Sequence, residues 1–162
     1  HLALVGRALG ADRFLLAGDE DQDMFDNLKS VEQRFGKGLD CEYLKSPMGW
    51  LRKFVEEDAG DGLPGVAVHL TMYGEPFREA IPKIRRDRPL VVIVGGAKVP
   101  GEVFKLSQYN VAVGNQPHSE VAALGLFLDS WYGGNTIDRK FEDARLIIEP
   151  SANGKKVIDL DK

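Results

Sequence analysis

Apolar residues along this chain fall into two patterns, short continuous runs and stripes with helical spacing. The clearest run is 90–94, which has five consecutive apolar residues, four of them β-branched. Continuous runs of this kind are typical of strands buried on both faces, as in a parallel sheet. Shorter runs predict further strands at residues 14–17, 41–44, 65–72 and 111–113.

Between these runs, apolar residues recur every three or four positions and predict amphipathic helices. The strongest helix is expected over 120–131, where the apolar stripe consists of Val121, Leu124, Phe127, Leu128 and Trp131. Weaker patterns predict helices over 1–9, 23–35, 48–56 and 77–86. The last of these contains Pro82, so we expect it to be kinked or split there.

Alternating strands and helices predict an α/β fold with a mostly parallel sheet flanked by helices. The C-terminal residues follow another pattern, because runs at 145–149 and 156–160 flank a turn that contains Asn153-Gly154. An Asn-Gly pair between apolar runs predicts a β-hairpin. We therefore expect one α/β domain over 1–137 and a C-terminal extension with a hairpin over 138–162.

The charge balance bears on possible partners. The chain has 162 residues with 21 basic and 25 acidic side chains, a formal net charge of −4. This mild acidity argues against a protein wrapped in nucleic acid, although a local basic patch stays possible. Two basic groups are either solvated surface or phosphate contacts, namely Lys83, Arg85, Arg86 and Arg88 in one stretch and Lys155 and Lys156 in the other.

Compartment and chain ends give weaker expectations. No apolar run approaches the ~18 residues of a membrane span, so we expect no membrane contact. The single cysteine, Cys41, excludes an internal disulfide framework and fits a reducing, cytoplasmic location, where it is expected to be a packed thiol. The chain opens on His1 with helical character and no visible signal peptide, so we expect the natural N-terminus to lie upstream.

Three predicted strand ends are rich in glycine and polar residues, at 69–74, 94–101 and 113–120. In open α/β sheets, ligands bind beyond the carboxyl ends of the strands. Gly95 and Gly96 lack Cβ atoms, so a flat ligand can lie against their backbone. The third stretch leads into a helix start, where free N–H groups attract anions. The alternative is that all three are plain strand-to-helix turns.

The sequence does not contain the common motifs of nucleotide-binding, serine-hydrolase or metal sites. The run at 95–98 is neither a dinucleotide-binding fingerprint nor a phosphate-binding P-loop. A serine nucleophile elbow does not occur. His69 and His118 are far apart in sequence, and acidic residues and histidines do not show metal-ligand spacing. We therefore expect no metal ion.

One long string is far more specific than a glycine pattern, the eight residues Val113-Gly114-Asn115-Gln116-Pro117-His118-Ser119-Glu120. Together with the stretches at 7–13, 69–74 and 95–100, it resembles the archaeal tRNA cytidine-56 2′-O-ribose methyltransferases of the SPOUT class. The resemblance covers roughly residues 1–137, which would then be the SPOUT methyltransferase domain. It implies a C-terminal trefoil knot, a feature that periodicity does not reveal and that is very rare among folds.

The resemblance also implies a cofactor and partners. Members of the class hold S-adenosyl-L-methionine in a bent shape through three knot loops and act as homodimers, here on tRNA in the TΨC loop. Carried over by position, the cofactor-binding residues are expected to be Leu70 in the first loop, Val94, Gly95, Gly96, Ala97 and Lys98 in the second, and Val113, Gly114, Asn115, Gln116, Pro117, His118, Ser119 and Glu120 in the third.

The implied reaction is attack of a ribose 2′-hydroxyl on the cofactor's methyl group, in which proton removal and alignment supply most of the acceleration. Related enzymes use an arginine from an early motif. Arg7 is the candidate in this chain, although its position does not match the related pattern, and the family's arginine-rich stretch lies upstream of His1. Asn115 and Ser119 either position the ribose or cofactor carboxylate or cap the helix.

Two other readings of the sequence stay open. One is a module that binds the cofactor or RNA without catalysis. The other is an α/β enzyme that binds a different small nucleotide.

Overall fold

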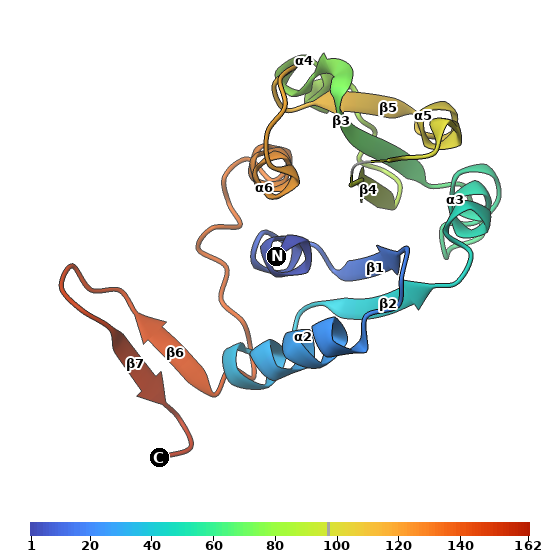
Figure 1. Cartoon of the computed structure of the whole chain (residues 1–162). Helices are drawn as coiled ribbons and strands as arrows, with labels where there is room; N and C mark the ends of the chain where they lie inside the picture. Colours follow the sequence, from blue (N-terminus) through green and yellow to red (C-terminus); the bar gives the residue numbers. More distant parts are fainter. Residues whose placement is uncertain (97) are drawn as a thin grey trace.

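The computed structural model describes residues 1–96 and 98–162 and has an α/β architecture with two parallel sheets and a hairpin (Figure 1). The first half contains α1 (Leu2–Ala8), β1 (Arg13–Ala17), α2 (Gln22–Phe35), β2 (Asp40–Leu44) and α3 (Pro47–Glu56). The second half contains β3 (Val66–Pro76), α4 (Phe77–Ala80), the 3-10 turn η1 (Ile81–Lys83), β4 (Leu90–Val94), α5 (Gly101–Leu106), β5 (Tyr109–Ala112), α6 (Glu120–Trp131), β6 (Leu146–Glu149) and β7 (Lys156–Asp159).

The larger sheet has the order β4-β3-β5, with all three strands parallel. Leu70 near the middle of β3 lies opposite Val94 of β4 on one side and Val111 of β5 on the other. Because the strands run in the same direction, their carboxyl ends meet at one edge. The core on this sheet includes the fully buried side chains of Val68, Val111 and Phe127, the last from α6.

The smaller sheet pairs β1 with β2, again parallel. It has a core of its own, in which Ala3 of α1, Leu28 of α2 and Leu39 before β2 are buried together. Sequence predicted a mostly parallel sheet, and the parallel strands are confirmed. They form two sheets, however, and within the described residues no hydrogen-bonded ladder joins them.

Several predicted elements are confirmed closely. The strand at 90–94 and the helix at 120–131 have the expected bounds. The helix predicted over 77–86 is split as expected, but α4 already ends at Ala80, and Pro82 lies inside η1, which ends at Lys83. The short helix α5 was not predicted. Its six residues bury only Val103, which is too little apolar surface to give a visible helical stripe.

The C-terminal strands β6 and β7 pair antiparallel, and Figure 1 shows this hairpin projecting from the rest of the molecule. The chain before it packs tightly on the end of α2, since a Cβ added at Gly36 would lie 2.7 Å from Phe141 Cβ. In the described part of the chain, no helix has the length and apolar character needed to cross a membrane. The same residues contain no cluster of three or more His, Cys, Asp or Glu side chains placed to hold a metal ion.

Candidate functional site at the carboxyl edge of the larger sheet

The first predicted loop leaves the sheet and returns to it. Leu70 and Glu75 of β3 both pair with Val111 of β5, so the four residues between them form an extra loop at this edge, here called the 71–74 loop. Leu70 itself is 7% exposed, while Met72 and Tyr73 of the loop are exposed to solvent. The register therefore forces a bulge at the position where the sequence predicts cofactor contact.

The 71–74 loop is held against the third loop by one side chain. Asn115 Nδ2 donates hydrogen bonds to Met72 O at 2.9 Å and to Gly74 O at 3.0 Å. Gly74 also allows this loop to lie directly on β5, because an added Cβ would lie 2.5 Å from backbone atoms of Asn110 and Val111. The first and third predicted loops are thus in direct contact.

The second loop follows β4, directly beside Leu70. Gly96 is exposed, and apart from its chain neighbours an added Cβ would meet no atom of the described residues within 4 Å. A Cβ at Gly95, in contrast, would collide with Val99. Lys98 is exposed, and Ala97, also predicted to contact cofactor, lies outside the described residues. The open space at Gly96 is what a ligand lying on the backbone needs.

The third loop contains a left-handed turn and ends at the start of α6. Gly114 has φ of +80°, a conformation that favours glycine. His118 Nε2 contacts Val113 O, and its Nδ1 lies 3.1 Å from Ser119 O, so the imidazole holds the loop in a tight curve. Gln116, Pro117 and Glu120 are exposed.

Ser119 is the N-cap residue of α6, but its side chain makes no capping hydrogen bond. A hydroxyl at a helix start that makes no capping hydrogen bond is available to a ligand, as are the free N–H groups of the first turn. The structure therefore does not favour the capping alternative for Ser119. For Asn115, both amide hydrogens are used on the 71–74 loop.

Sequence reasoning missed a polar pair beneath this edge. His69 is 1% exposed, and its Nδ1 lies 3.0 Å from Asn110 Oδ1, while Asn110 Nδ2 donates to Phe104 O at 3.0 Å. Burial lowers the pKa of His69 below its usual value, and the Asn110 contact opposes this only partly. A histidine inside an apolar run was the visible signal, but its partner is 41 residues away.

Arg7, the predicted catalytic group, lies elsewhere. Its Nη2 donates to Phe35 O at 2.8 Å and to Gly36 O at the end of α2, and its guanidinium lies 3.9 Å from the ring centre of Phe141. Only 7% of Arg7 is exposed, and burial lowers its pKa. The hydrogen bonds are made by Nη2, while Nε is buried without a hydrogen-bond partner among the described residues. Burial and the contacts of Nη2 count against proton transfer by Arg7, whose catalytic role stays a prediction.

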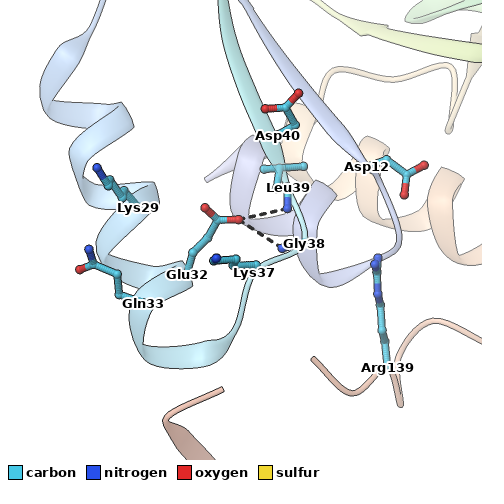
Figure 2. Close-up of a pocket in the computed structure, with 9 residues that line it drawn as sticks. All are labelled: Asp12, Lys29, Glu32, Gln33, Lys37, Gly38, Leu39, Asp40 and Arg139. Carbon is cyan, nitrogen blue, oxygen red and sulfur yellow. Dashed lines mark hydrogen bonds between the residues drawn. The ribbon is translucent and has the colours of Figure 1, made fainter. Parts of the chain in front are cut away.

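Two surface pockets lie away from the three predicted loops. Figure 2 shows one of about 630 Å³ between α2 and the start of β2, where Lys29 and Lys37 alternate with Glu32 and Asp40. The Glu32 carboxylate accepts hydrogen bonds from the backbone N–H groups of Gly38 and Leu39. A second, of about 730 Å³, is lined by α1, β1 and α2. Neither contains a predicted cofactor residue.

With the loops placed, comparisons with known proteins decide the family. The sequence profile of the family described as "tRNA ribose 2'-O-methyltransferase, aTrm56" matches residues 35–158. This chain belongs to that family. Its relatives named tRNA (cytidine(56)-2'-O)-methyltransferase include proteins from Methanocaldococcus jannaschii, 45% identical, and Thermococcus kodakarensis, 41% identical. The alignments cover 98% and 99% of this chain and 86% and 88% of those relatives.

A solved structure shares the fold. The SpoU methyltransferase AviRb from Streptomyces viridochromogenes, crystallised with the cofactor AdoMet, superposes with a TM-score of 0.61 at 18% identity. The match covers 85% of this chain and 53% of AviRb, so this chain spans about half the length of that protein. This chain therefore shares its α/β fold, with parallel strands and flanking helices, with AviRb.

Proposed function

We propose that this protein transfers the methyl group of S-adenosyl-L-methionine to the ribose 2′-hydroxyl of cytidine 56 in tRNA, in the cytoplasm. Relatives that align with nearly the whole chain are named tRNA (cytidine(56)-2'-O)-methyltransferase. The observation that carries the proposal is the register of the larger sheet. Leu70, Val94 and Val111 lie side by side, which brings the three predicted loops to one edge.

The residues at this edge have the chemical groups needed to hold the cofactor. Open space over Gly96 allows an adenosyl group to lie against the second loop, and the start of α6 with Ser119 offers donors to a carboxylate. When bound, S-adenosyl-L-methionine supplies an electrophilic methyl group on its sulfonium. We assign its binding to the positions predicted from sequence, except that the amide hydrogens of Asn115 hold the 71–74 loop.

The finer architecture belongs to the same proposal. We infer a trefoil knot formed by the chain around the second and third loops, and a homodimer in which each site lies near the partner subunit. We also infer a methyltransferase domain over 1–137 with 138–162 as an extension. The knot and the dimer rest on the resemblance to the SPOUT class, which the family match supports.

The protein's own contribution to the reaction is alignment and removal of the hydroxyl proton, because an alcohol is a weak nucleophile near neutral pH. An arginine is the group implied by the family resemblance. Arg7 is the candidate by that resemblance, and a structural role at the end of α2 is the alternative that its hydrogen bonds favour.

Methyl transfer to two matched substrates tests the function. Unmodified archaeal tRNA with cytidine 56 is expected to accept labelled methyl groups, while the same tRNA with dC56 is expected to accept none, because the 2′-hydroxyl is missing. Equal labelling of both would show that another atom is methylated. Binding of cofactor and tRNA without any transfer would favour the non-catalytic module.

A further inference from the structure

The 71–74 loop carries the most exposed large apolar side chain among the described residues, Tyr73, which is 76% exposed. The other three tyrosines donate their hydroxyls to backbone carbonyls, in Tyr43 to Gly18, in Tyr109 to Lys83 and in Tyr132 to Gly10. Within the described part of the chain, the Tyr73 hydroxyl makes no such bond. The ring therefore projects into solvent without a partner.

The backbone beneath this ring is fixed. The two carbonyls that accept from Asn115 Nδ2 belong to Met72 and Gly74, the residues on either side of Tyr73. The backbone N–H of Tyr73 lies 3.4 Å from Thr71 Oγ1, and Gly74 packs directly on β5. A ligand that stacks on this ring would order only the side chain, which keeps the entropic cost of binding low.

From this we propose that Tyr73 is a stacking platform for an unstacked base of the tRNA substrate, an inference that rests on the proposed function. An exposed aromatic ring on a fixed loop is the usual means by which proteins hold a base that has left its stack. Tyr73 lies three residues beyond Leu70, and its loop contacts the third loop. A base stacked on Tyr73 would therefore place its ribose next to the carboxyl edge of the larger sheet.

The test compares three variants for binding of fluorescently labelled tRNA and, separately, of S-adenosyl-L-methionine by calorimetry. Tyr73→Ala is expected to weaken tRNA binding between about 5-fold and 150-fold, which corresponds to loss of one base stack. Tyr73→Phe keeps the ring and is expected to bind tRNA within about twofold of wild type. The control is Leu63→Ala, another exposed apolar side chain, which lies before the opposite end of β3 and is expected to change nothing.

Three results would overturn the platform: unchanged tRNA affinity in Tyr73→Ala, an equal loss in Tyr73→Phe, or a parallel loss of cofactor affinity in Tyr73→Ala. The first leaves the ring free for another class of partner, the second assigns the effect to the hydroxyl, and the third places Tyr73 in the cofactor pocket. A wild-type protein that binds tRNA but transfers no methyl group would contradict the proposed function alone. A wild-type protein that binds no tRNA would contradict both.

Discussion

At the scale of single residues, Gly96 gives the most direct test of the second loop. Apart from its chain neighbours, a Cβ there meets no atom of the described residues within 4 Å, so a large side chain is compatible with folding. Gly96→Phe is expected to fill the space proposed for the adenosyl group and weaken binding of S-adenosyl-L-methionine at least about 100-fold. Calorimetry measures the affinity, and thermal unfolding within a few degrees of wild type shows that the fold is intact.

Gly96→Ala serves as the smaller step at the same position and is expected to have an intermediate effect. Undiminished cofactor affinity in Gly96→Phe would show that the second loop does not contact the cofactor.

Substitution of Arg7 distinguishes a structural role of this arginine from a catalytic role. Arg7→Met keeps the aliphatic stem but leaves Phe35 O and Gly36 O without their donor, and it removes the contact of the guanidinium with Phe141. We expect the free energy of unfolding to fall by about 2–3 kcal/mol, since buried carbonyls without partners are costly. Urea titration measures this loss, and kcat is measured well below the unfolding temperature.

A structural Arg7 predicts kcat within about threefold of wild type once the variant is folded. Unchanged stability with kcat reduced 100-fold or more, and no rescue in Arg7→Lys, would instead identify Arg7 as the arginine of the reaction.

At this scale the sequence was informative where a residue type carries its own chemistry. Gly96 was singled out for its free backbone and Ser119 for its place at a helix start, and the structure provides open space at Gly96 and a hydroxyl without a capping hydrogen bond at Ser119. The hydrogen bonds of Asn115 were not predictable, because they cross 41 and 43 residues of chain and depend on the bulge in β3.

At the scale of elements, the sheet beneath the site contains a buried titratable side chain, His69, in contact with Asn110. The pKa of His69 is lowered by burial from its usual value of 6.5, so the folded protein keeps this side chain neutral while the unfolded chain takes up a proton as pH falls. Stability present above pH about 6.5 is therefore lost as the pH falls toward the folded pKa. One proton adds a slope of at most ~1.4 kcal/mol per pH unit.

This slope is measured by urea unfolding between pH 5 and 8. His69→Gln, which retains a donor toward Asn110 but does not titrate, is expected to show a flatter curve. If His69→Gln lost stability with acid as steeply as wild type, another group would control the dependence.

Elements were predictable where burial alone sets the pattern. The strand β4 and the helix α6 had the expected bounds because they pack on the main core and leave continuous or striped apolar residues. The six residues of α5 lacked such a stripe. The extension of β3 to Pro76 was not predicted, because Glu75 and Pro76 pair with β5 after a register shift and not through an apolar pattern.

At the scale of the whole molecule, the fold brings distant loops together by parallel pairing. Apolar runs predicted the parallel strands, but they did not show that β1 and β2 form a sheet of their own around Ala3, Leu28 and Leu39. Such a division depends on which helix covers which strand, and that is set by contacts across the chain. The proposal that three loops form one cofactor site depends only on the larger sheet.

Hydrogen–deuterium exchange with and without S-adenosyl-L-methionine tests that claim most directly, because it reports on all three loops in one experiment. We predict that the cofactor slows amide exchange together in residues 70–74, 94–98 and 113–120, with no change in the hairpin of β6 and β7. Protection of one loop alone, or of the hollow around Glu32 and Lys37 instead, would contradict a single site at the carboxyl edge of the larger sheet.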